Sequence, residues 1–239
     1  MLEQFKQYVD SFNSCDAIKY KYIHSIKVMN LSEQLGKNLN IKGLELVKLI
    51  GLLHDYARFT QWDKYKSFND LKTFDHGDEA VKILFEQKEI EKYNVKKEQY
   101  QIIKDAIKYH NKYEIGNVNN ESLIYCQIIR DADKLDIISN FTKGIFKDND
   151  GDFIHDEIKE QFFNHTQVKT LKDSTTNDKL IIMLALIYDL NFIYSFKYLK
   201  EYKIIENIKK QVDKETFEIY FNEIEKYTEQ KLKEKKYVR

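Results

Sequence analysis

Histidine and aspartate residues occur along the first part of this chain at intervals that could bring them together around a metal ion. The dipeptide His54-Asp55 is central to the pattern. The full set is His24, His54, Asp55, His76, His110 and Asp131. Imidazole and carboxylate groups together suit a divalent transition metal or magnesium, since neither is a soft thiolate ligand. The set therefore predicts a divalent cation site.

The position of Asp55 strengthens this prediction. It follows the apolar run Leu49–Leu53, so its carboxylate is expected to be buried, which is costly without a positive partner. Neighbouring residues on a helix point about 100° apart. The side chains of His54 and Asp55 can therefore contact the same group only if that group lies beyond the end of the helix, as a bound cation would. Taken singly, each histidine could be an ordinary core residue and Asp55 a turn residue, but together they favour the metal site.

Arginine is placed selectively in this chain. Only three of the 39 basic residues are arginine, and two of them, Arg58 and Arg130, lie beside the acidic residues of the set. Arginine offers a planar, bidentate donor fork for a phosphate or carboxylate. We expect Arg58 to contact substrate, whereas Arg130 is equally well explained by a structural ion pair.

Long helices are needed to position these side chains, and the composition supports them. The chain has no proline and seven glycines, and its apolar residues recur at helical spacing. The fold class is therefore all-α. Helices are expected around Ile18–Leu35, Leu44–Leu53, Val81–Phe85, Gln99–Tyr109, Glu121–Asn140, Asp178–Tyr198, Ile204–Val212 and Lys214–Lys233, with breaks near Asn40 and at Phe68–Asp75, Gly116–Asn120 and Lys147–Asp152. On this map the candidate ligands come from several helices that face one centre.

The metal-site motifs resemble those of a known protein family. His24, His54-Asp55 and Asp131 match the H…HD…D pattern of the HD-domain superfamily of metal-dependent phosphohydrolases. Other segments resemble a group of small bacterial HD hydrolases of undefined substrate, namely Leu52–Phe59, Ser67–Asp70, Asp75–Gly77, Arg130–Asp136 and, less specifically, Tyr188–Phe192. The resemblance implies an HD-domain helical bundle with additional C-terminal helices. We expect one domain over residues 1–239, with a metal-binding core at about 16–145 and helices at about 153–239 packing on it.

The resemblance also implies a ligand set. One cation would be held by His24, His54, Asp55 and Asp131, while His76 and His110 would hold either a second metal or substrate phosphate. The sequence does not separate these cases. The cofactor would be a divalent ion, Mn, Fe, Ni, Co, Mg or Zn, with one or two per chain.

The implied activity is hydrolysis of a phosphomonoester or phosphodiester, with a nucleotide as the expected substrate class. A metal-activated water, held at Asp55, would be the nucleophile. Arg58, His76, His110 and Lys134 would balance charge on the phosphate, which makes Asp55 and Arg58 the expected catalytic residues. Lys134 could instead form an ordinary helix-surface pair with Asp131. Gln61 could donate to substrate or belong to a loop.

Two other functions fit the same residues. A di-iron oxygenase on the HD scaffold would use the same ligand order, and a sensor module would bind a nucleotide without turnover. His155 and His165 have no metal-like partner set and stay unassigned.

Composition limits partners and location. Basic and acidic residues balance at 39 each, so no nucleic-acid groove is expected. The apolar stretch at Leu180–Leu199 is interrupted by charge and is expected to be a core helix instead of a membrane span. Two widely separated cysteines and the absence of a signal peptide favour a cytoplasmic protein. A homodimer is left open.

Overall fold

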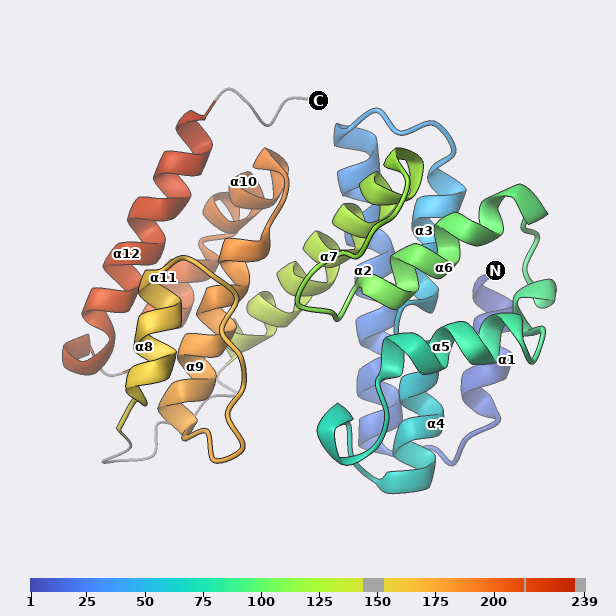
Figure 1. Ribbon diagram of the computed structural model, residues 1–239, viewed down its shortest axis with the longest axis horizontal. Helices are drawn as coiled ribbons and strands as arrows, with labels where there is room; N and C mark the ends of the chain where they lie inside the picture. Colours follow the sequence, from blue (N-terminus) through green and yellow to red (C-terminus); the bar gives the residue numbers. More distant parts are fainter. Residues whose placement is uncertain (144–152, 213, 235–239) are drawn as a thin grey trace. The chain divides into compact units, whose positions relative to one another are not determined.

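The structure is a computed structural model that describes residues 1–143, 153–212 and 214–234. Within these ranges all regular elements are helices, which confirms the all-α prediction (Figure 1). The break expected at Lys147–Asp152 lies outside the described residues. The contacts divide the chain into two compact units, Met1–Asp133 and Lys134–Arg239.

The helices of the first unit precede and include the start of α7. They are α1 Leu2–Asp10, α2 Asp16–Asn38, α3 Leu44–Leu53, α4 Tyr56–Tyr65, η1 Asp70–Lys72, α5 His76–Phe85, η2 Glu89–Lys92, η3 Lys97–Gln99, α6 Tyr100–Tyr109 and α7 Asn120–Asn140. Helix α2 packs on α3 and α4, α3 packs on α6, and α5 packs on both α4 and α6. The candidate ligands lie at the ends of several of these helices.

Helix α1 closes the first unit through aromatic contacts. Phe5 is fully buried and lies 5.9 Å from Tyr22 of α2 and 5.8 Å from Phe59 of α4, measured between ring centroids. Tyr8 stacks on Tyr56 at 3.8 Å. Aromatic pairs of this kind add to the stability gained by burial alone. They fix the start of α4, which follows directly after Asp55.

Two glycines allow close helix packing near the candidate ligands. A Cβ atom on Gly51 of α3 would lie 2.8 Å from Met29 Cα of α2. A Cβ atom on Gly77 of α5 would lie 3.0 Å from the carbonyl oxygens of Ile107 and Lys108 of α6. Any larger residue would force these backbones apart, because packed interiors leave little free space. The glycines therefore set the spacing of α2 against α3 and of α5 against α6.

The second unit contains the rest of α7 and the helices after it. These are η4 Phe141–Lys143, α8 Asp156–Phe163, α9 Thr176–Ala185, η5 Leu186–Asp189, α10 Ile193–Glu201, α11 Ile204–Lys209 and α12 Lys214–Lys233. Helix α8 packs on α9, and α10 and α11 both pack on α12. Its core contains fully buried Phe162, Phe196, Phe217 and Phe221.

One helix prediction was wrong in this unit. A single helix was expected over Asp178–Tyr198, but the structure ends α9 at Ala185 and begins α10 at Ile193. Between them Leu190 and Phe192 have extended backbones. Asp189 at the break pairs with Lys134 at 2.7 Å, so a polar contact interrupts an otherwise helical apolar pattern. Among the described residues, no helix is both long enough and apolar enough to cross a membrane.

Candidate metal centre

Two histidines occupy the same local position at the ends of different helices. His54 is the C-cap of α3, and His110 is the C-cap of α6. In each, Nδ1 lies within hydrogen-bond distance of the carbonyl oxygen three residues earlier, 2.8 Å from Gly51 O and 2.7 Å from Ile107 O. A carbonyl only accepts, so Nδ1 carries the proton and donates it. This bond satisfies a free carbonyl at the helix end and turns each Nε2 toward the site.

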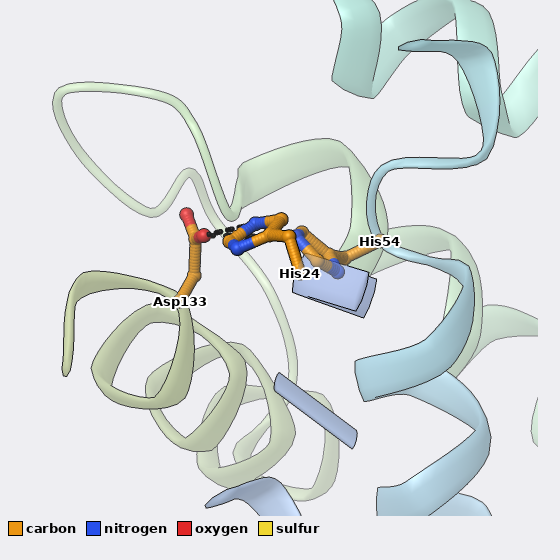
Figure 2. Close-up of side chains that lie close together, drawn as sticks. All are labelled: His24, His54 and Asp133. Carbon is orange, nitrogen blue, oxygen red and sulfur yellow. Dashed lines mark hydrogen bonds and ion pairs between the residues drawn. The ribbon is translucent and has the colours of Figure 1, made fainter. Parts of the chain in front are cut away.

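The first group of donor atoms joins α2, α3 and α7. His24 Nε2 lies 3.2 Å from His54 Nε2 and 3.1 Å from Asp133 Oδ1, and His54 Nε2 lies 3.6 Å from the same oxygen. Figure 2 shows the three side chains converging. His24 and His54 are buried, and Asp133 is nearly so. The spacing and residue types make this group able to hold a metal ion.

The carboxylate from α7 differs from the expected one. The sequence placed it at Asp131, whereas the structure brings Asp133 to His24 and His54. Asp131 is also fully buried and has contacts of its own. Residues two apart on a helix point about 200° apart, so Asp131 and Asp133 extend from α7 in different directions. We therefore add Asp133 to the candidate ligand set, and the ligand role of Asp131 stays a prediction.

Asp55 lies between two pairs of histidines. Its Oδ2 atom is 3.4 Å from His24 Nε2 and 3.6 Å from His54 Nε2. Its Oδ1 atom is 3.4 Å from His76 Nε2 and 3.8 Å from His110 Nε2. The side chain is almost fully buried. One carboxylate thus faces a separate imidazole pair with each oxygen, an arrangement that can bridge two cations.

In the second pair, His76 and His110, a hydrogen bond at Nδ1 orients each ring. The two Nε2 atoms are 3.0 Å apart, and both rings are buried. His76 Nδ1 donates to Asp70 Oδ2 at 2.5 Å. His110 Nδ1 donates to the carbonyl oxygen of Ile107 at 2.7 Å. Carboxylates and carbonyls in this position commonly orient metal-binding histidines. The amide of Asn111 also lies beside Asp70 and His76.

Burial shapes the charge of these groups. Burial lowers the pKa of His110 well below its usual value, and the neighbouring histidines lower it further. Burial also lowers the pKa of His76, although the hydrogen bond to Asp70 offsets part of this effect. The two rings are therefore neutral near pH 7, and a neutral imidazole has one protonated nitrogen and one lone pair.

The carboxylates are ionised despite their burial. Burial by itself raises the pKa of Asp55, but the positive groups around it, above all Lys21, hold that pKa well below its usual value. For Asp133, burial likewise acts to raise the pKa, and its close contacts with His24 and His54 outweigh that effect and hold the pKa well below its usual value. Two buried anions among histidine lone pairs form a donor set suited to divalent cations.

The distances between the histidine Nε2 atoms are a separate reason to expect a cation at this site. His76 and His110 both use Nδ1–H elsewhere, so two lone pairs face each other at 3.0 Å and repel unless positive charge lies between them. Donor atoms at right angles around a cation about 2.1 Å away are themselves about 3.0 Å apart. The observed nitrogen separations of 3.0 and 3.2 Å match that value.

Arg58 was expected to contact substrate, and Gln61 to donate to substrate or belong to a loop. In the structure both side chains are hydrogen-bonded to the loop before α5. Arg58 donates to Gln61, Asp70 and the carbonyl of Phe68, each at 2.7 Å, and its Nε lies 3.5 Å from Asp55 Oδ1. Gln61 is fully buried and donates to Asp70 and Thr73. These contacts give both side chains a positioning role around Asp70.

Arg130 and Lys134 also have protein partners. Arg130 donates to the carbonyls of Tyr109, Lys112 and Tyr113, next to His110, so it caps the end of α6. Lys134 belongs to the second unit, where it pairs with Asp189 at 2.7 Å.

Three polar residues at the site were missed in the sequence. Asp133 lies two positions from the expected ligand, and Asp70 lies in a segment that was noted only for resemblance. Lys21, which donates to Asp55 Oδ2 at 2.7 Å, was not singled out. Lys21 lies three residues before His24, on the same face of α2, and this helical spacing was the available signal.

Comparison with known proteins agrees with this geometry. The family model for the HD domain matches residues 22–138, a range that contains His24, His54-Asp55, His76, His110 and Asp133. No curated protein and no solved structure matches the chain. The matched range coincides with the residues that form the candidate metal centre. Residues 22–138 of the chain therefore form a domain of the HD superfamily, whose members are in general metal-dependent hydrolases.

Proposed function

We propose that this protein is a metal-dependent phosphohydrolase that hydrolyses a phosphomonoester or phosphodiester, with a nucleotide as the substrate class. The observation that supports it best is the division of donor atoms around Asp55, whose two oxygens face two imidazole pairs. When bound there, divalent cations lower the pKa of a water and polarise a phosphoryl oxygen. The ligands would be His24, His54, Asp55 and Asp133 on one side, and Asp55, His76 and His110 on the other.

The hydrogen bonds favour a second cation over phosphate at His76 and His110. A phosphate oxygen needs N–H donors, but both rings donate through Nδ1 to Asp70 and to Ile107 O. Their Nε2 atoms therefore offer lone pairs, which repel an anion. Asp55 Oδ1 adds a negative charge 3.4 Å from His76 Nε2. The pair accordingly suits a cation, and substrate phosphate would be bound elsewhere on the same centre.

Aromatic groups beside the centre support a nucleotide substrate. The Phe68 ring centroid lies 5.3 Å from Lys21 Nζ and 5.9 Å from Arg58 Cζ, and both of these cations contact Asp55. Trp62 lies 4.9 Å from Phe68, and both rings are partly exposed. Aromatic faces of this kind can stack on a nucleobase. Such a base would lie beside the phosphate that the centre acts on.

The test is phosphate release from a panel of nucleotides and other phosphoesters, with Mn, Mg, Ni, Co, Fe(II) or Zn added in turn. Asp55→Ala should abolish release because it removes the oxygens shared by both histidine pairs. Asp63→Ala is the matched control, since Asp63 is exposed and, among the described residues, forms its ion pair with Lys66. Release that persists in Asp55→Ala would overturn the proposal. Nucleotide binding without release under any metal would instead support the sensor module.

The same two-sided arrangement of Asp55 also favours a second candidate, a di-iron oxygenase. That activity needs two cations per chain, which the two imidazole pairs could hold. It is distinguished by oxygen consumption with Fe(II)-loaded protein during loss of an organic substrate. Iron-loaded protein that releases phosphate without consuming oxygen would exclude it.

The cysteines support a reducing compartment such as the cytoplasm. Cys15 and Cys126 are both free, and burial raises the pKa of the Cys126 thiol to about 12. A thiol that is almost fully protonated near pH 7 is poorly reactive. The proposed partner is a phosphorylated small molecule.

A further inference from the structure

Lys21 forms an unusual contact with the proposed metal ligands. Its ammonium donates to Asp55 Oδ2 at 2.7 Å, and its side chain is only 13% exposed. Asp55 Oδ2 is the oxygen that also faces His24 Nε2 at 3.4 Å and His54 Nε2 at 3.6 Å. Lys21 therefore places a positive charge on the atom that the first cation of the proposed centre would use.

Lys21 and the first metal ion would compete for the same oxygen, Asp55 Oδ2. A lysine ammonium is a compact cation on a flexible stem of four carbons, and a divalent cation on the same oxygen would repel it. Among the described residues, Asp55 is the one acceptor of the Lys21 ammonium. The ammonium also lies 5.3 Å from the centroid of the partly exposed Phe68 ring, which could hold it beside the site if it left Asp55.

The other basic side chain beside Asp55 is held by protein groups. Arg58 donates to Gln61, Asp70 and Phe68 O. It cannot leave these partners without exposing buried polar groups, which is costly. Lys21 has a single ion pair to give up. It is therefore the cation best able to neutralise an anionic ligand at the centre.

We propose that Lys21 is an exchangeable counter-cation that competes with the metal for Asp55 Oδ2 and binds an anionic oxygen of the ligand once the metal holds that carboxylate. The inference rests on the proposed function for the identity of the ligand as a phosphoryl group. Its competition with the metal does not depend on any substrate. Lys21 thus acts twice, as a neutralising group for buried Asp55 and as a positioning group for phosphate.

The first test is Mn²⁺ binding by isothermal titration, without substrate. Lys21→Gln should bind the first Mn²⁺ about fivefold to tenfold more tightly, because the competing ion pair is lost. Lys21→Arg should bind it within about twofold of the original protein, since it keeps the charge. Lys19→Gln is the matched control, because Lys19 is exposed on the same helix and makes the same charge change. Unchanged or weaker Mn²⁺ binding by Lys21→Gln would overturn the proposal.

The second test separates exchange from a permanent structural ion pair. Thermal unfolding of Lys21→Gln should begin from a lower midpoint than the original protein in the presence of a chelator, because Asp55 loses its neutralising partner. With saturating Mn²⁺ that difference should disappear. A permanent ion pair would give the same loss in both conditions, and that result would contradict the exchange.

The third test concerns the anion and uses inorganic phosphate as the probe. Phosphate should bind Mn²⁺-loaded Lys21→Gln at least about tenfold more weakly than the original protein, with recovery in Lys21→Arg. Equal phosphate affinity would remove the positioning role. If the original protein releases no phosphate from any ester, the proposed function fails, while the Mn²⁺ and unfolding results still decide whether Lys21 exchanges with the metal.

Discussion

Asp70 accepts a hydrogen bond from His76 Nδ1 at 2.5 Å, and this pair connects the metal centre to the loop before α5. Asp70 Oδ1 accepts from Arg58 at 2.7 Å and from Gln61 at 3.0 Å. Burial acts to raise the pKa of Asp70, but His76 and Arg58 lower it below its usual value, so the carboxylate is ionised. Arg58 and Gln61 thus position His76 through Asp70.

Asp70→Asn should weaken the second cation site. Loss of the carboxylate charge makes the His76 ring a poorer ligand, and substitutions behind metal-binding histidines typically reduce metal affinity about 10- to 100-fold. Mn²⁺ titration should show the first site retained and the second weakened by that factor. Asp63→Asn, on the exposed side of α4, should retain both sites. Two sites of unchanged affinity in Asp70→Asn would show that His76 is not a ligand.

The choice between Asp131 and Asp133 gives a second prediction. Asp133 Oδ1 lies 3.1 Å from His24 Nε2, so Asp133→Asn should lose the first Mn²⁺ site. Asp131→Asn should retain it. Because Asp131 is fully buried, its variant is compared by circular dichroism to establish that it is folded. Loss of Mn²⁺ binding in a folded Asp131→Asn, with binding retained in Asp133→Asn, would restore the ligand set expected from the sequence.

The sequence was informative about the type of site and less so about its exact members. The apolar run before His54-Asp55 and the helical period correctly predicted that these residues lie at the end of a helix, but helix α4, which begins at Tyr56, was not predicted from the sequence. It did not distinguish Asp131 from Asp133, because both lie in a helix that is buried on more than one face, and burial on all sides removes the pattern that marks the inner face.

Tertiary partners explain the other differences. The resemblance and the rarity of arginine drew attention to Arg58, but whether a guanidinium faces substrate or a loop depends on Asp70, twelve residues away in the chain. Likewise, the helix expected over Asp178–Tyr198 is broken where Asp189 meets Lys134. Local periodicity contains no information about such distant pairs, whereas short-range features such as caps can be read from sequence.

Gly77→Ala should disturb the second cation site through the backbone. The added Cβ would lie 3.0 Å from two carbonyl oxygens of α6, and it would also clash with Asn111 Oδ1 at 2.5 Å. Because backbone atoms cannot move aside cheaply, α5 should shift and separate His76 from His110, at a cost of about 1–3 kcal/mol in unfolding free energy. Urea unfolding and Mn²⁺ titration measure the two effects.

Gly36→Ala is the control for that variant. A Cβ there would meet only side-chain atoms of Leu44 and Val47, at 3.0 Å or more, and these can adjust. It should retain both cation sites. Tight binding of two Mn²⁺ ions by Gly77→Ala would show that the approach of α5 to α6 does not set the geometry of the second site.

In the second unit, Asp178 joins the start of α8 to the start of α9. The side chain is fully buried and accepts hydrogen bonds from the backbone N–H groups of His155 and Thr175, each at 2.9 Å, and from His155 Nδ1 at 2.5 Å. Burial alone raises the pKa of Asp178, but these hydrogen bonds outweigh it and lower the pKa below its usual value. His155 thus has a structural partner in this contact.

This lowered pKa predicts how stability depends on pH. A carboxyl whose pKa is lower in the folded state stabilises the fold above its unfolded pKa of about 3.9, and that stabilisation is lost as pH falls through the folded pKa. Asp178→Asn should therefore reduce the unfolding free energy by about 1–3 kcal/mol near pH 7, where a charged acceptor is lost. The difference between the two proteins should shrink below about pH 4, because Asp178 of the unfolded chain then binds a proton that the folded state does not. Urea unfolding of both proteins from pH 7 to pH 3 measures it, and other acid-sensitive groups cancel in the comparison. A difference that stays constant over this range would mean that the charge of Asp178 does not contribute to the stability of the contact.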